Sequence, residues 1–247
     1  MLRVKDIVAV FILCICSQGL YAQSYNIKKD ITEAFQSSDT DALGRAMNGV
    51  KELIIESTTE PGVYVVDTLS VCDILSHIEN ISENITYDSN PDNRIAADLL
   101  YSLYSSIIGR YSVAISSSEK IVRFLEANPN YDRYFYCGIL DMLSGYYFEN
   151  QDYESSIKHS TKLMKHLRKV EDVSNILFYD SSMHIARSEF NLGNIKSAYK
   201  HIKIAYNHPD KDYLSGRLSI NSAYVEILQS LASTAISKNN FKRFIEY

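Results

Sequence analysis

The segment MLSGYYFENQDYESSIKHSTKLM, residues 142–164, decides the fold of this chain, because two similar segments flank it at equal spacing. LYSLYSSIIGRYSVAISSSEKIV starts at Leu100 and HIARSEFNLGNIKSAYKHIKIAY starts at His184, so each start lies 42 positions from the one at Met142. The three segments align without a gap. A fixed spacing of this kind predicts an array of similar structural units.

In each segment, a polar turn separates two stretches in which small and large residues alternate in the same way. The turns are Gly109-Arg110-Tyr111, Gln151-Asp152-Tyr153 and Gly193-Asn194-Ile195. Before them stand Tyr101-Ser102, Leu143-Ser144 and Ile185-Ala186, and after them Ala114-Ile115, Ser156-Ile157 and Ala198-Tyr199. Two helices cross closely where small side chains face each other and larger neighbours fill the flanks. Each segment therefore predicts a pair of antiparallel helices.

This pattern resembles the tetratricopeptide repeat (TPR), with a large-small pair in the first helix, Gly or Asp and Tyr at the turn, and a small residue early in the second helix. The resemblance covers roughly residues 95–247. It departs from the family in a period of 42 rather than about 34 residues and in the absence of tryptophan. It implies an all-α, right-handed α-solenoid of antiparallel helix hairpins. The longer period is similar to extended TPR variants in sensor and regulatory proteins.

The pattern places the helices of the array in pairs. The predicted ranges are 93–108 with 112–127, 132–149 with 153–169, 174–191 with 195–207, and a further first helix over 214–237. Asn128-Pro129 and His208-Pro209 end helices, because proline and the residue before it disfavour helical backbone. Residues 238–241 resemble a fourth turn, and the sequence ends at Tyr247 soon after it. We expect an array that is incomplete or unusually terminated at this end.

The region before the array, residues 23–90, predicts helices with a less regular pattern. A helix hairpin is expected around Ser37-Ser38-Asp39, as a degenerate first repeat. After the Pro61-Gly62 break, residues 63–66 fit a short strand, but a mostly helical segment running through Ile81 is favoured. The boundary with the array, which spans 91–247, is placed in the segment YDSNPDN.

Residues 1–22 are typical of a secretory signal peptide. A basic start with Arg3 and Lys5 precedes an apolar run over 7–16, and Ala22 stands just before Gln23. The run is too short to span a bilayer, which takes about 20 apolar residues. The LYAQ ending resembles exported proteins of the Bacteroides type. We expect an exported protein of the periplasm or cell envelope, with cleavage after Ala22.

The net charge disfavours one class of partner, and the cysteines allow one disulfide. The formal net charge is -5, and it becomes -6 without the signal peptide, which holds two basic residues and one acidic residue. An acidic chain is a poor candidate for nucleic acid, which requires a basic face. Cys72 and Cys137 remain after cleavage. They could pair in an oxidising compartment, but two separate buried thiols are favoured.

No motif for catalysis or cofactor binding is found in the sequence. His159 and His166 lie on one predicted helix face, as do His201 and His208, but no H-E-x-x-H or paired-cysteine motif completes a zinc site. The carboxylates Asp141, Glu149 and Asp180 are explained more simply by a charged, solvated face. We therefore expect no cofactor, no metal and no enzyme activity, which disfavours a glycan or cell-wall enzyme.

The resemblance implies a binding surface, because the first helices of TPR arrays line the concave side. By matching position, the wider set of candidates is Leu103, Ser106, Asp141, Gly145, Phe148, Glu149, Met183, Arg187, Phe190 and Asn191. The partner-binding residues selected from it are Phe148, Glu149, Arg187, Phe190 and Asn191. Aromatic residues beside an arginine are typical of interface hot spots. The alternative is that Phe148 and Phe190, which occupy the same position in neighbouring segments, pack between the repeats.

Two functions fit these observations. The first is a non-catalytic exported scaffold that binds a protein or peptide through the concave face. The second is the periplasmic sensor domain of a membrane-bound transcriptional regulator or histidine kinase whose C-terminal part is missing here. Only the second would involve the membrane, through that missing segment.

Overall fold

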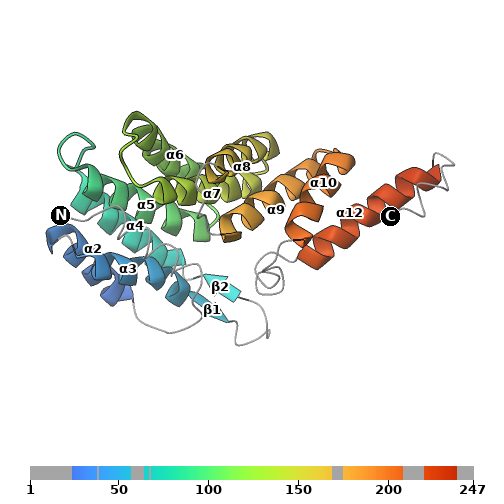
Figure 1. The fold of residues 1–247 in the computed structure, drawn as a ribbon. Coiled ribbons are helices and arrows are strands. Elements are labelled where there is room, and N and C mark those ends of the chain that lie inside the picture. Colours follow the sequence, from blue (N-terminus) through green and yellow to red (C-terminus); the bar gives the residue numbers. More distant parts are fainter. Residues whose placement is uncertain are drawn as a thin grey trace. The chain divides into compact units, whose positions relative to one another are not determined.

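The computed structural model describes residues 24–37, 39–56, 64–66, 68–168, 175–207 and 220–237 (Figure 1). In these ranges the protein is all-α, with ten α-helices in which consecutive helices pack pairwise, one 3-10 helix and one two-stranded hairpin. The all-α class expected from the sequence is therefore confirmed for the described part. The proposed signal peptide, the Pro61-Gly62 break, the His208-Pro209 stop and the turn after Ser237 lie outside the described residues. The chain forms two compact units, divided between Ile139 and Leu140.

The first unit begins with two packed helices, α2 (Ser24–Ser37) and α3 (Thr40–Asn48). Asp39 begins α3, because its side chain accepts hydrogen bonds from the backbone N–H groups of Asp41 and Ala42. The expected hairpin around residues 37–39 is thus present. The 3-10 helix η1 (Gly49–Leu53) follows α3 directly.

A small antiparallel hairpin then joins β1 (Ile54–Glu56) to β2 (Tyr64–Val66), with Ile54 opposite Val66. The short strand that the sequence allowed at residues 63–66 is present as Tyr64–Val66, although the segment as a whole was expected to be mostly helical. Pairing with β1 satisfies the backbone groups of β2, and the local pattern does not reveal that partner. Helix α4 (Thr68–Ser82) follows and packs on α2 and α5.

The remaining helices agree with the predicted ranges to within two residues at each end, except that the described part of the helix predicted for 214–237 begins at Ile220 and residues 214–219 lie outside the described residues. They are α5 (Pro91–Ile107), α6 (Tyr111–Ala127), α7 (Arg133–Glu149), α8 (Tyr153–Leu167), α9 (Asn175–Asn191), α10 (Ile195–Tyr206) and α12 (Ile220–Ser237). Helices α5, α7 and α9 each have 17 residues, and their first residues lie 42 positions apart. The division between the two units falls inside α7.

The three turns that follow these helices have the same backbone geometry. Gly109, Gln151 and Gly193 have positive φ angles of 73°, 61° and 76°. In each turn this residue donates its N–H to the carbonyl three positions earlier, and the next residue donates to the carbonyl five positions earlier. These two bonds form the Schellman motif, which ends a helix on a left-handed residue. The sequence pattern at the turns thus corresponds to one structural motif used three times.

The small residues of the pattern are buried where the helices pack. Ser102, Ser144, Ala186, Ala114, Ser156 and Ala198 are all inaccessible to solvent. In the second unit, the core lies among α9, α10 and α12. It is formed by Tyr179, Met183, Ala186, Ala198, Ile202, Ala205, Ile227 and Leu231. Burial of each large side chain of this kind contributes about 1.5–3 kcal/mol to folding.

Cys72 and Cys137 both belong to the first unit and are thiols, with no disulfide between them. Cys137 is buried and Cys72 half-buried. This outcome agrees with the favoured expectation of two separate thiols.

Candidate binding face of α7, α9 and α12

In the second unit, α7 and α9 bring Phe148 and Arg187 into contact. The guanidinium carbon of Arg187 lies 4.4 Å from the centre of the Phe148 ring. This is a cation–π contact, worth about 0.5–1 kcal/mol where water has access. Tyr153 and His184 flank the same ring, with centroid distances of 5.6 and 6.4 Å. Phe148 is therefore half-buried between neighbouring helices, and Arg187 lies over its ring.

His184 of α9 lies against Gly145 of α7. Gly145 lies one turn before Phe148, and a Cβ atom built on it would stand 3.5 Å from Cε1 of His184. His184 in turn lies one turn before Arg187 on α9. The two helices thus contact through Gly145, Phe148, His184 and Arg187. Gly145 and Arg187 were identified from the sequence, but His184 was missed. Its position one turn before Arg187 is the signal that could have found it.

Burial keeps His184 neutral. Its Nδ1 atom is buried and has no hydrogen-bond partner among the described residues. Burial, with a smaller effect of the nearby positive charge of Arg187, lowers the pKa of His184 to about 4. Near neutral pH the contact therefore carries a single positive charge, on Arg187. A neutral imidazole and a phenylalanine ring form the surface around it.

Phe190 lies beside residues of α12. It packs against the core of α9, α10 and α12 and remains half-buried. It also lines an open hollow of about 460 Å³, together with four polar residues of α12. These residues, all missed by sequence reasoning, are Glu226, Gln229, Ser230 and Ser233. The expected packing of Phe190 is thus seen on one side, while its role in partner binding stays a prediction.

The other predicted residues lie near this face with different exposure. Glu149 and Asn191 are exposed at the ends of α7 and α9. The Asn191 side-chain amide donates a hydrogen bond of 2.8 Å to the backbone carbonyl of Arg187. Met183 is fully buried in the core, so its assignment to the groove is wrong. Residues of α10 and α12 cover Met183, and the sequence around Met183 does not indicate that they do.

The acidic residues do not form the solvated face that the sequence suggested. Glu149 is exposed as expected, Asp141 is half-buried, and Asp180 is only 6% exposed. Within the described ranges, no group of three or more His, Cys, Asp or Glu residues could hold a metal ion. The same ranges contain no helix with the length and hydrophobicity to cross a bilayer.

Comparison with known proteins gives no family. No protein-family model matches the chain, and no curated protein matches its sequence. The candidate face is therefore interpreted from its own geometry and chemistry.

Proposed function

We propose that this chain is a non-catalytic binding protein of the TPR-like α-solenoid type, whose hairpins repeat at a spacing of 42 positions. The proposal is supported by three turns with one hydrogen-bonding motif at that spacing and by first helices of equal length. Stacked hairpins of this kind bury their small-residue seams and leave an extended surface for recognition. That surface is the face of α7, α9 and α12.

The observation that carries the proposal is that α9 contributes to two neighbouring features, an arginine–aromatic contact and an open hollow. Arg187 covers Phe148 towards α7, and Phe190 lines the hollow towards α12. Arginine and aromatic residues dominate the binding energy of protein interfaces. The hollow has a volume of about 460 Å³, within the range of about 300–1,000 Å³ found for binding sites.

The chemistry of the hollow favours a peptide segment with an apolar side chain next to a basic one. Phe190 offers an aromatic surface, whereas the exposed Glu226 offers a carboxylate. Gln229 and Ser233 supply amide and hydroxyl groups that can pair with a peptide backbone. The acidic net charge of the chain also favours a basic partner.

The proposal is tested by placing a photo-crosslinking amino acid at Gln229, in the hollow, and at Leu69, which is 84% exposed on α4 in the other unit. Crosslinking in the native cell envelope is expected to give a distinct protein adduct from position 229 but not from position 69. Arg187→Glu and Phe190→Ser are expected to abolish that adduct. An adduct that forms equally from both positions, or that survives both substitutions, would contradict this function.

We also propose export, on the grounds of the signal-like segment 1–22. The test is N-terminal sequencing of the protein from native cells, with fractionation of the envelope. The mature chain is expected to start at Gln23 in the periplasmic or envelope fraction. An intact Met1 in the cytosolic fraction would contradict it.

A further inference from the structure

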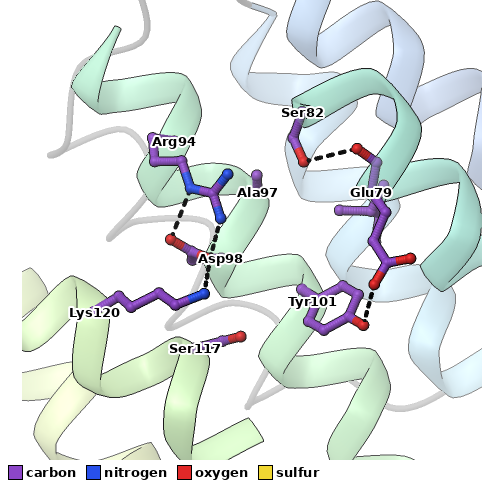
Figure 2. A pocket seen from close by; sticks show the side chains of 9 residues that line it. Glu79, Ser82, Arg94, Ala97, Asp98, Tyr101, Ser117 and Lys120 are labelled. Carbon is purple, nitrogen blue, oxygen red and sulfur yellow. Dashed lines mark hydrogen bonds and ion pairs between the residues drawn. The ribbon is translucent and has the colours of Figure 1, made fainter. Parts of the chain in front are cut away.

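In the first unit, helices α4, α5 and α6 surround a polar hollow of about 120 Å³ (Figure 2). Its polar lining consists of Glu79 and Ser82 from α4, Arg94, Asp98 and Tyr101 from α5, and Ser117 and Lys120 from α6. It is separate from the face of α7, α9 and α12, since it belongs to the other unit. Neither the repeat pattern nor the proposed peptide binding uses these side chains.

Asp98 is the unusual residue of the hollow, because it is only 2% exposed. The matching positions of α7 and α9 hold the uncharged Leu140 and Ser182. A buried carboxylate costs several kcal/mol unless it is paired and hydrogen-bonded. A buried charge at a position that holds packing residues in the other two helices therefore indicates a function specific to this hollow.

The partners of Asp98 place positive charge on one wall. Arg94 donates to it from Nε at 3.0 Å and from Nη2 at 2.7 Å, and the Tyr87 hydroxyl donates at 2.8 Å. The Lys120 ammonium stands 3.8 Å from the same carboxylate. Asp98 is thus largely saturated by Arg94 and Tyr87, whereas Lys120, which is 45% exposed, has N–H groups left for another acceptor.

The opposite wall carries an acceptor. Glu79 receives a hydrogen bond from the Tyr101 hydroxyl through one carboxylate oxygen, which leaves the second oxygen available. Burial and this hydrogen bond raise the pKa of Tyr101 to about 12, so the hydroxyl keeps its proton and donates. Figure 2 shows Glu79 and Lys120 on opposite sides, with Tyr101 and Ser117 between them. Ser117 is 3% exposed and its hydroxyl points into the hollow.

We propose that this hollow binds a small zwitterion, namely a free α-amino acid with a small side chain. Its carboxylate would accept hydrogen bonds from Lys120 and Ser117, and its ammonium group would donate to Glu79. A simple anion would pair with Lys120 but not with Glu79, and a simple cation would pair with Glu79 but not with Lys120. The hollow of about 120 Å³ is small, so glycine, alanine and serine, the smallest amino acids, are the ligands to test first.

The test is isothermal titration calorimetry of the purified chain with glycine, L-alanine and L-serine. Acetate and methylammonium serve as probes of each half of the site. At least one amino acid is expected to bind with a Kd about tenfold or more below those of both probes. Lys120→Met and Glu79→Gln are each expected to weaken it by about tenfold or more, because each removes one charge-assisted contact.

Lys162→Met is the matched control, because Lys162 occupies the position of Lys120 in α8, in the other unit. It is expected to leave the Kd unchanged. Thermal unfolding of each variant checks the fold. If Lys120→Met unfolds the chain, Lys120→Arg is expected to retain binding, and Glu79→Gln remains decisive. Acetate binding as tight as that of glycine, or the absence of heat with all three amino acids, would overturn the proposal.

Discussion

Gln151 adopts the same left-handed backbone conformation as Gly193, its counterpart in the next turn, with φ angles of 61° and 76°. Both residues hold the same place in a Schellman motif. Glycine takes this conformation without steric cost, whereas for a residue with a Cβ atom it costs about 1–2 kcal/mol. The helix pair α7–α8 therefore keeps its turn geometry although its sequence is poorly suited to it.

Gln151→Gly is expected to stabilise the chain by about 0.5–1 kcal/mol, since it relieves the left-handed strain. Gly193→Ala is the reverse control and is expected to destabilise by about 1 kcal/mol. No atom lies within 4 Å of a Cβ built on Gly193, so any loss comes from the backbone and not from a clash. Urea denaturation measures both changes. Equal stability of all three proteins would show that the turn stores no strain.

Asp98→Ala is expected to destabilise the first unit by about 3–5 kcal/mol, because it leaves Arg94 with an unpaired, partly buried charge. The double change Arg94→Tyr with Asp98→Leu introduces the residues of the matching positions, Tyr136 and Leu140. It is expected to recover at least half of that loss, since no charge stays buried. Denaturant unfolding of both variants measures the difference. A single variant as stable as the parent would show that the ion pair contributes nothing.

His184 makes stability depend on pH. Its pKa is lowered to about 4 in the folded chain, against about 6.5 when unfolded. The folded state therefore binds fewer protons, and stability that is complete above pH 6.5 is lost as the pH falls towards 4. The loss is expected to reach roughly 3 kcal/mol. Denaturation at pH 7 and pH 4.5 should show it.

His184→Gln is expected to flatten the acid-induced loss that His184 causes, because glutamine does not titrate. His159→Gln, which replaces a histidine stacked on Tyr147 at 5.0 Å, serves as the matched control and should keep the loss. If both variants follow the parent between pH 7 and 4.5, His184 is not the responsible group.

Ala198→Phe is expected to destabilise the second unit by about 1–3 kcal/mol. Ala198 belongs to α10 and is fully buried in the core that α10 shares with α9, so a larger side chain overpacks the helix crossing. Lys200→Phe, at an exposed position of the same helix, should change stability by less than about 0.5 kcal/mol. Thermal unfolding compares the two. A tolerated phenylalanine at position 198 would remove the reason for a small residue there.

The repeat pattern predicted the helices well because the pairs are local. Each turn joins helices that are neighbours in sequence, so small residues such as Ser144 and Ser156 mark a contact within one segment. The strand at Tyr64–Val66 was allowed by the pattern, but its partner Ile54–Glu56, which lies before the Pro61-Gly62 break, was not recognised. Of the candidate site, Phe148 and Arg187 were identified, whereas Glu226 and Gln229 were not, since 214–237 was predicted only as a further first helix and no groove residues were assigned to it.

The sequence by itself determined the turns, the helix ends and the small-residue positions, because backbone conformation and close packing of adjacent helices depend on nearby residues. Only the tertiary structure decided that Met183 is covered, that Phe190 borders a hollow and that Asp98 is buried between Arg94 and Lys120. The exposure and the partners of these side chains depend on other helices of the chain. The periodic sequence pattern indicates which face of a helix packs, but not which helix it packs against.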